Sequence, residues 1–152
     1  MARAILLAVE RIDEMQDHFN FLNNRLVQGL CELNDQLPEL DIRFNSLVTD
    51  DLQKQSPSIV NFSFAPVEGE VLLHHLEEKS IFVGLGSACS ASSKKPSKIL
   101  TGIGLSEEEA RCSLRVSFSG NNTIEDIDLF LKEFSIAYQG LYPTFREKHS
   151  RN

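Results

Sequence analysis

The chain has little positive charge, few cysteines and no long apolar run. Its 152 residues include 15 Lys and Arg against 22 Asp and Glu, a net charge of −7 with a pI near 5.1. Because these basic residues are scattered and in deficit, they form no footprint for a phosphate backbone, and we expect no nucleic-acid partner. No apolar run approaches the roughly 20 residues of a membrane-spanning helix, and the N-terminus lacks a signal-peptide pattern. We therefore expect a cytoplasmic protein without a membrane partner.

The three cysteines, Cys31, Cys89 and Cys112, are odd in number and widely spaced, which excludes the disulfide framework of a secreted domain. Cys31 lies among the periodic apolar positions of the first helix and Cys112 immediately precedes a strand, so both are predicted to be small packing residues. His74 and His75 are neighbours on a helix and diverge by about 100 degrees. Without a Cys-x-x-Cys pair to complete a site, we expect no metal.

The length of 152 residues, with 41% hydrophobic and 24% charged residues, predicts one domain over residues 1–152, and hydrophobic periodicity predicts its elements. From Ile5 to Leu33, apolar residues recur every three or four positions, which is typical of one long amphipathic helix that Pro38 ends. No capping residue precedes this helix, so we expect the chain to begin inside or just at an element that had something before it. Further strands are predicted at 42–45, 59–64, 81–83 and 114–118, and helices at 69–79, from the Ser106 and Glu109 capping box, and from Thr123.

The segment 84–97 differs from the rest, because it consists almost wholly of Gly, Ala, Ser and Lys around Cys89. Such a composition cannot bury a core face, so we expect a flexible loop that exposes the thiol. Lys94, Lys95 and the start of a helix near Ser97 would favour the thiolate. On the residues alone, Cys89 could equally be a free cysteine that happens to lie in a loop.

Arg115 alternates with Leu114, Val116 and Phe118, so it occupies the polar face of its strand. An arginine there can bind an anion, and its guanidinium fork matches the two oxygens of a carboxylate. Asn61 could face the same side from the other strand. The alternative is an ordinary arginine facing solvent on the open side of a sheet.

The chain resembles the cysteine desulfurases of the class V aminotransferase family, of the NifS and IscS type. The segments that carry the resemblance are Asn61-Phe62-Ser63-Phe64, Val67-Glu68-Gly69-Glu70, Gly86-Ser87-Ala88-Cys89-Ser90, Ser113-Leu114-Arg115-Val116-Ser117 and Asn122-Thr123. The resemblance implies an α/β fold, the small C-terminal domain of fold-type I pyridoxal-phosphate enzymes. In it, a short, mostly antiparallel sheet packs against long helices.

The resemblance also implies roles for Cys89 and Arg115, whereas Asn61 is a candidate only because it is expected on the same face as Arg115. Cys89 matches the nucleophile that takes sulfur from L-cysteine, giving L-alanine and a persulfide for acceptors such as an iron-sulfur cluster scaffold. Arg115 matches the arginine that grips the substrate carboxylate, with Asn61 as a further substrate-binding candidate. The full-length enzyme is expected to be a homodimer.

The family's cofactor lysine lies in a Ser-x-His-Lys segment, and this sequence has none. We therefore expect the pyridoxal-phosphate-binding large domain to be absent, no cofactor on this chain, and no turnover by the chain alone without its own large domain. The alternatives are a stand-alone sulfur-carrier or scaffold-docking module, and a related selenocysteine lyase or aminotransferase.

Overall fold

The fold is built on a three-stranded antiparallel sheet. The computed structural model describes residues 3, 9, 11–45, 56–86 and 96–149. In this part of the chain the strands are β1 (Arg43–Phe44), β2 (Ile59–Ser63) and β3 (Ser113–Ser117), in the order β1-β2-β3. The register places Phe44 opposite Phe62 and Asn61 opposite Arg115. The central strand β2 therefore lies between two partners far from it in sequence.

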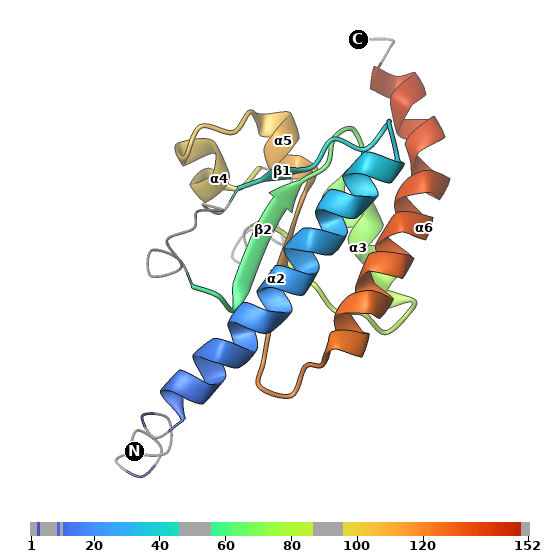
Figure 1. The fold of residues 1–152 in the computed structure, drawn as a ribbon. Helices are drawn as coiled ribbons and strands as arrows, with labels where there is room; N and C mark the ends of the chain where they lie inside the picture. The colour runs from blue at the N-terminus through green and yellow to red at the C-terminus, as the bar shows by residue number, and fades with distance from the viewer. Residues whose placement is uncertain (1–2, 4–8, 10, 46–55, 87–95, 150–152) are drawn as a thin grey trace.

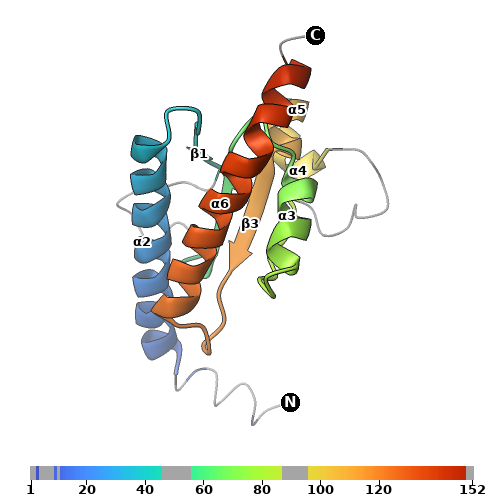
Figure 2. The same ribbon diagram turned by 90° about the vertical axis from the view of Figure 1, so that its right-hand side faces the viewer.

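Three helices cover one face of this sheet. They are α2 (Ile12–Gln36), α3 (Gly69–Glu77) and α6 (Ile124–His149), and α6 contacts both of the others. Figures 1 and 2 show α6 between α2 and α3 in one helical layer. The short helices α4 (Lys98–Gly102) and α5 (Glu107–Arg111) pack against each other near one end of the sheet. The predicted α/β class, with a short antiparallel sheet against long helices, is confirmed.

Strand alternation produces the core between the sheet and the helical layer. The sheet contributes the fully or nearly fully buried side chains of Val60, Phe62, Leu114 and Val116, and the helices contribute Leu22, Leu26, Leu30, Leu72, Leu76, Phe130, Phe134 and Tyr138. The Phe134 ring packs edge-on against Phe62 and Phe64, with centroids 5.6 and 5.3 Å away. Because each strand turns every second residue inward, its polar residues face the opposite side.

The strand predicted over residues 81–83 is wrong. In the structure, residues 81–83 form no strand, and only the next residue, Gly84, bridges to β3. The Gly84 N–H donates to the Arg115 carbonyl at 2.9 Å, and the Gly84 carbonyl accepts from the Arg115 N–H at 2.7 Å. Phe82 is 80% exposed. The apolar residues before Gly84 suggested a strand, but only one residue of this segment reaches the ladder.

The predicted capping box opens α5. The Glu109 N–H donates to Ser106 Oγ at 3.1 Å, and the Ser106 N–H donates to the Glu109 carboxylate at 2.7 Å. These Ser106 contacts, and then the Arg43 guanidinium, hold the pKa of the Glu109 carboxyl below its ordinary value. The box therefore fixes the start of α5 beside β1.

Replacing Ser106 by Ala should lower the free energy of unfolding by about 1 kcal/mol, since the side-chain acceptor at the helix start is lost. Urea unfolding of the purified chain, followed by circular dichroism, measures the change. Ser56→Ala, at an exposed serine that caps no helix, is the matched control. Equal stability of the two variants would contradict an energetic role for the cap.

Candidate functional site

The candidate site is the face of the sheet opposite the core. Its side chains come from the two long strands, Asn61 and Ser63 from β2 and Ser113 and Arg115 from β3. Ser63 and Ser113 are 3% and 1% exposed, so this polar face is partly shielded from water. Most buried polar atoms in proteins are hydrogen-bonded, and both serine hydroxyls are, Ser63 to the Glu109 carbonyl at 3.0 Å and Ser113 to the Ala110 carbonyl at 2.9 Å.

Arg115 is half-buried and packs over Gly84. A Cβ added at Gly84 would lie 3.0 Å from Nη2 and 3.3 Å from Nε of Arg115. Because Gly84 has no side chain, the Arg115 guanidinium can pack against it, next to the backbone hydrogen bonds that join the two residues. Within the described ranges, no carboxylate forms an ion pair with Arg115. The fork of donors of Arg115 therefore lies on this face, beside the start of segment 84–97, which contains Cys89 and is called the cysteine loop below.

Asn61 lies directly across from Arg115, as the sequence predicted. Its Oδ1 accepts a hydrogen bond from Asn45 Nδ2 at 2.8 Å, and the same Nδ2 donates to Ser63 Oγ at 2.8 Å. Ser63 Oγ in turn donates to the Glu109 carbonyl at 3.0 Å. These contacts link β1, β2 and α5 across the polar face. The substrate-binding role of Asn61 stays a prediction.

Three residues of this face were missed by the sequence analysis. Ser63 could have been found, because it alternates with Asn61 on the same strand. Nothing local distinguishes Asn45, which reaches the face only through the pairing of β1 with β2. Gly84 was treated as part of a loop, although it pairs with Arg115.

The start and the end of the cysteine loop are fixed by described residues, while Cys89, Lys94 and Lys95 lie outside them. At the start, Gly86 packs closely against Leu100 and the Ser113 hydroxyl. At the end, buried Ser97 caps α4 by accepting the Leu100 N–H at 3.4 Å, so the helix start predicted near Ser97 is confirmed. Cys89 follows Gly86 by three residues in the sequence.

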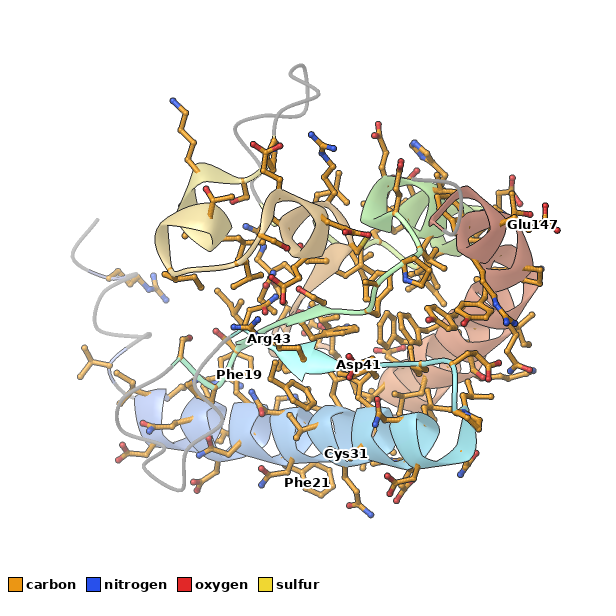
Figure 3. All side chains as sticks on the ribbon, turned by 90° about the horizontal axis from the view of Figure 1, so that it is seen from above. Phe19, Phe21, Cys31, Asp41, Arg43 and Glu147 are labelled. Carbon is orange, nitrogen blue, oxygen red and sulfur yellow. The ribbon has the colours of Figure 1, made fainter. Side chains whose placement is uncertain are left out.

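The other two cysteines differ from each other. Cys112 is 2% exposed, and desolvation raises the pKa of its thiol to about 12, which confirms it as a packing residue. Cys31 is exposed, so the same prediction is wrong for it. The buried face of α2 carries Leu26, Gly29 and Leu30, and residue 31 is turned about 100 degrees further around the helix. Figure 3 places Cys31 on α2, across the molecule from α4 and α5.

Alkylation of the native chain with iodoacetamide at pH 7 should leave Cys112 largely unmodified, because its thiol is buried and protonated. We expect Cys89 to react fastest and Cys31 to react as an ordinary exposed thiol. Peptide mass spectrometry over time measures the three rates, and labelling in urea is the control in which Cys112 becomes reactive. Native labelling of Cys112 as fast as Cys31 would contradict the structure.

The described residues do not fit pyridoxal phosphate. The cofactor needs a lysine held in a shaped site, whereas Lys79, Lys98 and Lys132 are all exposed and none belongs to the polar face.

Within the described ranges, no group of three His, Cys, Asp or Glu side chains could hold a metal ion. No helix there is long and apolar enough to cross a bilayer.

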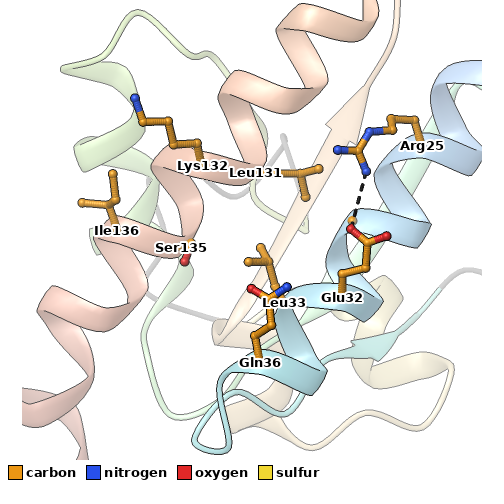
Figure 4. Close-up of a pocket in the computed structure, with 9 residues that line it drawn as sticks. Arg25, Glu32, Leu33, Gln36, Leu131, Lys132, Ser135 and Ile136 are labelled. Carbon is orange, nitrogen blue, oxygen red and sulfur yellow. Dashed lines mark ion pairs between the residues drawn. The ribbon is translucent and has the colours of Figure 1, made fainter.

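A hollow of about 290 Å³ lies between α2 and α6 and shares no residue with the polar face (Figure 4). Its charged side chains already have partners. Arg25 pairs with Asp128 at 2.6 Å and with Glu32 at 3.9 Å, and Lys132 pairs with Glu133 at 3.9 Å. The polar face, where Arg115 has no such partner, is the stronger candidate for a ligand.

Comparison with known proteins identifies relatives of most of the chain. The family model described as class-V aminotransferase matches residues 7–130. Cysteine desulfurase IscS of Clostridium botulinum is 39% identical over 132 residues, which are 87% of this chain and 32% of that protein. Cysteine desulfurase IscS of Vibrio campbellii is 36% identical over 137 residues, which are 90% of this chain and 31% of that protein.

Solved structures give the same result. A NifS-like protein has a TM-score of 0.73 and 26% identity, with 92% of this chain and 32% of that chain covered. The NifS-like protein from Rickettsia africae, at 24% identity and a TM-score of 0.56 over 79% of this chain and 29% of its own, shows the shared fold. The chain thus spans about a third of the length of these relatives. The resemblance stated from the motifs is confirmed, and the chain belongs to the class-V aminotransferase family.

Proposed function

We propose that this chain is the part of a pyridoxal-phosphate-dependent cysteine desulfurase that binds the carboxylate of L-cysteine and accepts its sulfur. The observation that carries the proposal is the Arg115 guanidinium, which has no carboxylate partner among the described residues and lies over Gly84, at the start of the cysteine loop. The likeness to two proteins named cysteine desulfurase supports it.

In this proposal each residue has one task. Arg115 binds both carboxylate oxygens of L-cysteine through its guanidinium fork, and Asn61 adds a neighbouring donor. The Cys89 thiolate attacks the substrate sulfur, the carbon–sulfur bond breaks, and a proton replaces sulfur on the carbon. The thiolate electron pair forms the new S–S bond of the persulfide, and the electron pair of the broken C–S bond ends in the new C–H bond of L-alanine. The two sulfurs together are thus oxidised by two electrons and the carbon is reduced by two. Pyridoxal phosphate, held by residues outside the described ones, supplies the electron sink for this chemistry.

The same proposal includes the surroundings of the enzyme. The persulfide would pass to an acceptor protein such as an iron-sulfur scaffold, and the full-length enzyme would be a homodimer with its own large domain around the cofactor. A cytoplasmic location is part of the proposal, supported by an odd number of cysteines without a disulfide framework.

A chimera tests the function directly. In this chimera, the third of the Clostridium botulinum relative that matches this chain is replaced by this chain, and the rest of the relative is kept. With L-cysteine and a thiol reductant, the chimera should release alanine and sulfide in equal amounts. A chimera that is folded, dimeric and loaded with cofactor, yet releases neither product, would contradict the proposal. Much faster turnover of L-selenocysteine than of L-cysteine would favour the selenocysteine lyase alternative.

The 152-residue chain alone should retain no covalently bound pyridoxal phosphate, since Lys79, Lys98 and Lys132 are exposed and no lysine lies in the family's Ser-x-His-Lys segment. The measurement is the visible absorbance of the chain after incubation with the cofactor and gel filtration, with the chimera as the positive control. A retained chromophore that maps to one lysine would show that this chain holds the cofactor itself.

A further inference from the structure

Phe82 is the most exposed of the large apolar side chains in the described part of the chain, at 80%. Single apolar residues at a protein surface are common and need no function. What distinguishes Phe82 is its place in the chain, two residues before Gly84, the glycine over which the Arg115 guanidinium packs. The direction of its side chain therefore decides whether it belongs to the candidate site.

Side chains alternate between two directions along residues 81–86. The inward positions, which pack against the core, are Ile81, Val83 and Leu85. The positions between them point the other way. A Cβ added at Gly84 would lie 3.0 Å from the Arg115 guanidinium, and one added at Gly86 would lie 3.2 Å from the Ser113 hydroxyl. By the same alternation Phe82 is turned to the polar face, and it is the only one of these three residues with a side chain.

The polar face becomes apolar toward the end of β3. Gly84 bridges to Arg115 in the antiparallel sense, so Phe82 lies toward the Ser117 end of that strand. Directly across from Ser117 on β2 is Ile59, which is 42% exposed. An anion bound by the Arg115 guanidinium therefore has exposed apolar side chains on this side of it.

From this arrangement we infer that Phe82 is a substrate-contacting residue, whose ring packs against the carbon atoms beside the carboxylate that Arg115 binds. The Phe82 and Gly84 Cα atoms are at most about 7 Å apart. A carboxylate oxygen bonded to the guanidinium lies about 2.8 Å from its nitrogens, so the next carbons of the ligand come within the span of the ring. The ring would cover these carbons and keep water from the ion pair, which strengthens the pair. The inference rests on the proposed function for its ligand, an α-amino acid.

Binding to the cofactor-free chimera tests this contact without turnover. The probes are phosphopyridoxyl-L-alanine, a stable adduct that carries the carboxylate and the carbons beside it, and pyridoxamine phosphate, which lacks the carboxylate. Isothermal titration calorimetry measures both dissociation constants. Phe82→Ala should weaken binding of the adduct about tenfold, on the scale of exposing about 50 Å² of apolar surface, and should leave binding of pyridoxamine phosphate unchanged. Phe82→Leu keeps an apolar side chain and should recover most of the loss.

The matched control is Phe21→Ala, which removes the same ring from a position on α2 that is 58% exposed, and it should change neither dissociation constant. In the 152-residue chain, Phe82→Ala should leave the urea midpoint unchanged, because an exposed ring contributes little to stability. Weaker binding of the adduct is then no consequence of unfolding.

Unchanged adduct binding by Phe82→Ala, or an equal loss for both probes, would overturn the inference. If adduct binding depends on Phe82 as expected but the unmodified chimera does not desulfurate L-cysteine, the proposed function fails alone. If the chimera desulfurates L-cysteine and Phe82→Ala binds the adduct normally, the inference fails alone. A folded chimera that binds neither probe would overturn both.

Discussion

Replacing Cys89 by Ser in the chimera is expected to lower the release of alanine and sulfide from L-cysteine by roughly a thousandfold or more, on the scale of losing an enzyme's nucleophile. A serine hydroxyl is not ionised at neutral pH and cannot carry a persulfide sulfur, so the sulfur of the substrate has no acceptor. The measurement is product formation with and without a thiol reductant, because the reductant releases sulfide only from a persulfide that has formed.

The exposed Cys31 makes the matched control. Cys31→Ser makes the same replacement of sulfur by oxygen at an accessible thiol on α2, across the molecule from α4 and α5, and should leave turnover unchanged. Substrate should still be bound by Cys89→Ser, since Arg115 and Asn61 are intact. Normal alanine release by Cys89→Ser, or loss of activity in Cys31→Ser, would remove Cys89 from its proposed role.

The sequence predicted the parts of the fold that depend on repeated patterns. The buried side of α2 follows from apolar residues at helical spacing, and the two faces of β2 and β3 follow from strand alternation. Alternation also placed Arg115 and Asn61 on one face. The register that makes them direct partners needs a tertiary pairing between residues more than 50 positions apart, which no local pattern contains.

The remaining features depend on single contacts. Asn45 reaches the polar face because it follows the two-residue strand β1, and Gly84 reaches it because one backbone bridge joins it to Arg115. Neither has a periodic signal, and the apolar run at 81–83 suggested more pairing than forms. Cys31 was misassigned because the sequence does not fix how α2 is rotated about its axis. A small residue at the edge of the buried face of a helix therefore looks the same in the sequence as one within that face. The cysteine loop stays a prediction from composition, and the pairing of Gly84, at its start, with Arg115 follows only from the fold.

The polar face combines groups that stabilise the fold with groups that do not. The Asn45, Ser63 and Glu109 contacts join β1, β2 and α5, so their loss should affect stability. The Arg115 side chain packs over Gly84 but forms no ion pair in the described part of the chain, although it occupies the middle of β3. Its side chain can therefore be removed with little effect on the fold, which makes it the better test of function.

In the 152-residue chain, Arg115→Ala should change the free energy of unfolding by no more than about 1 kcal/mol, because no ion pair is broken and the backbone pair with Gly84 remains. Urea unfolding measures this. Arg111→Ala, which removes a surface pair with Glu107, is the matched control and should fall in the same range.

In the chimera, the same substitution should weaken kcat/KM for L-cysteine by about 2 to 4 kcal/mol, the scale of losing a bidentate charge-assisted contact. The loss should appear mainly as a higher KM, since the carboxylate is gripped both before and during the reaction. Arg115→Lys keeps the charge but not the planar fork, so it should recover only part of the loss. Arg111→Ala should leave the kinetics unchanged. Normal desulfuration by Arg115→Ala would show that the carboxylate is bound elsewhere and that this guanidinium serves only the packing over Gly84.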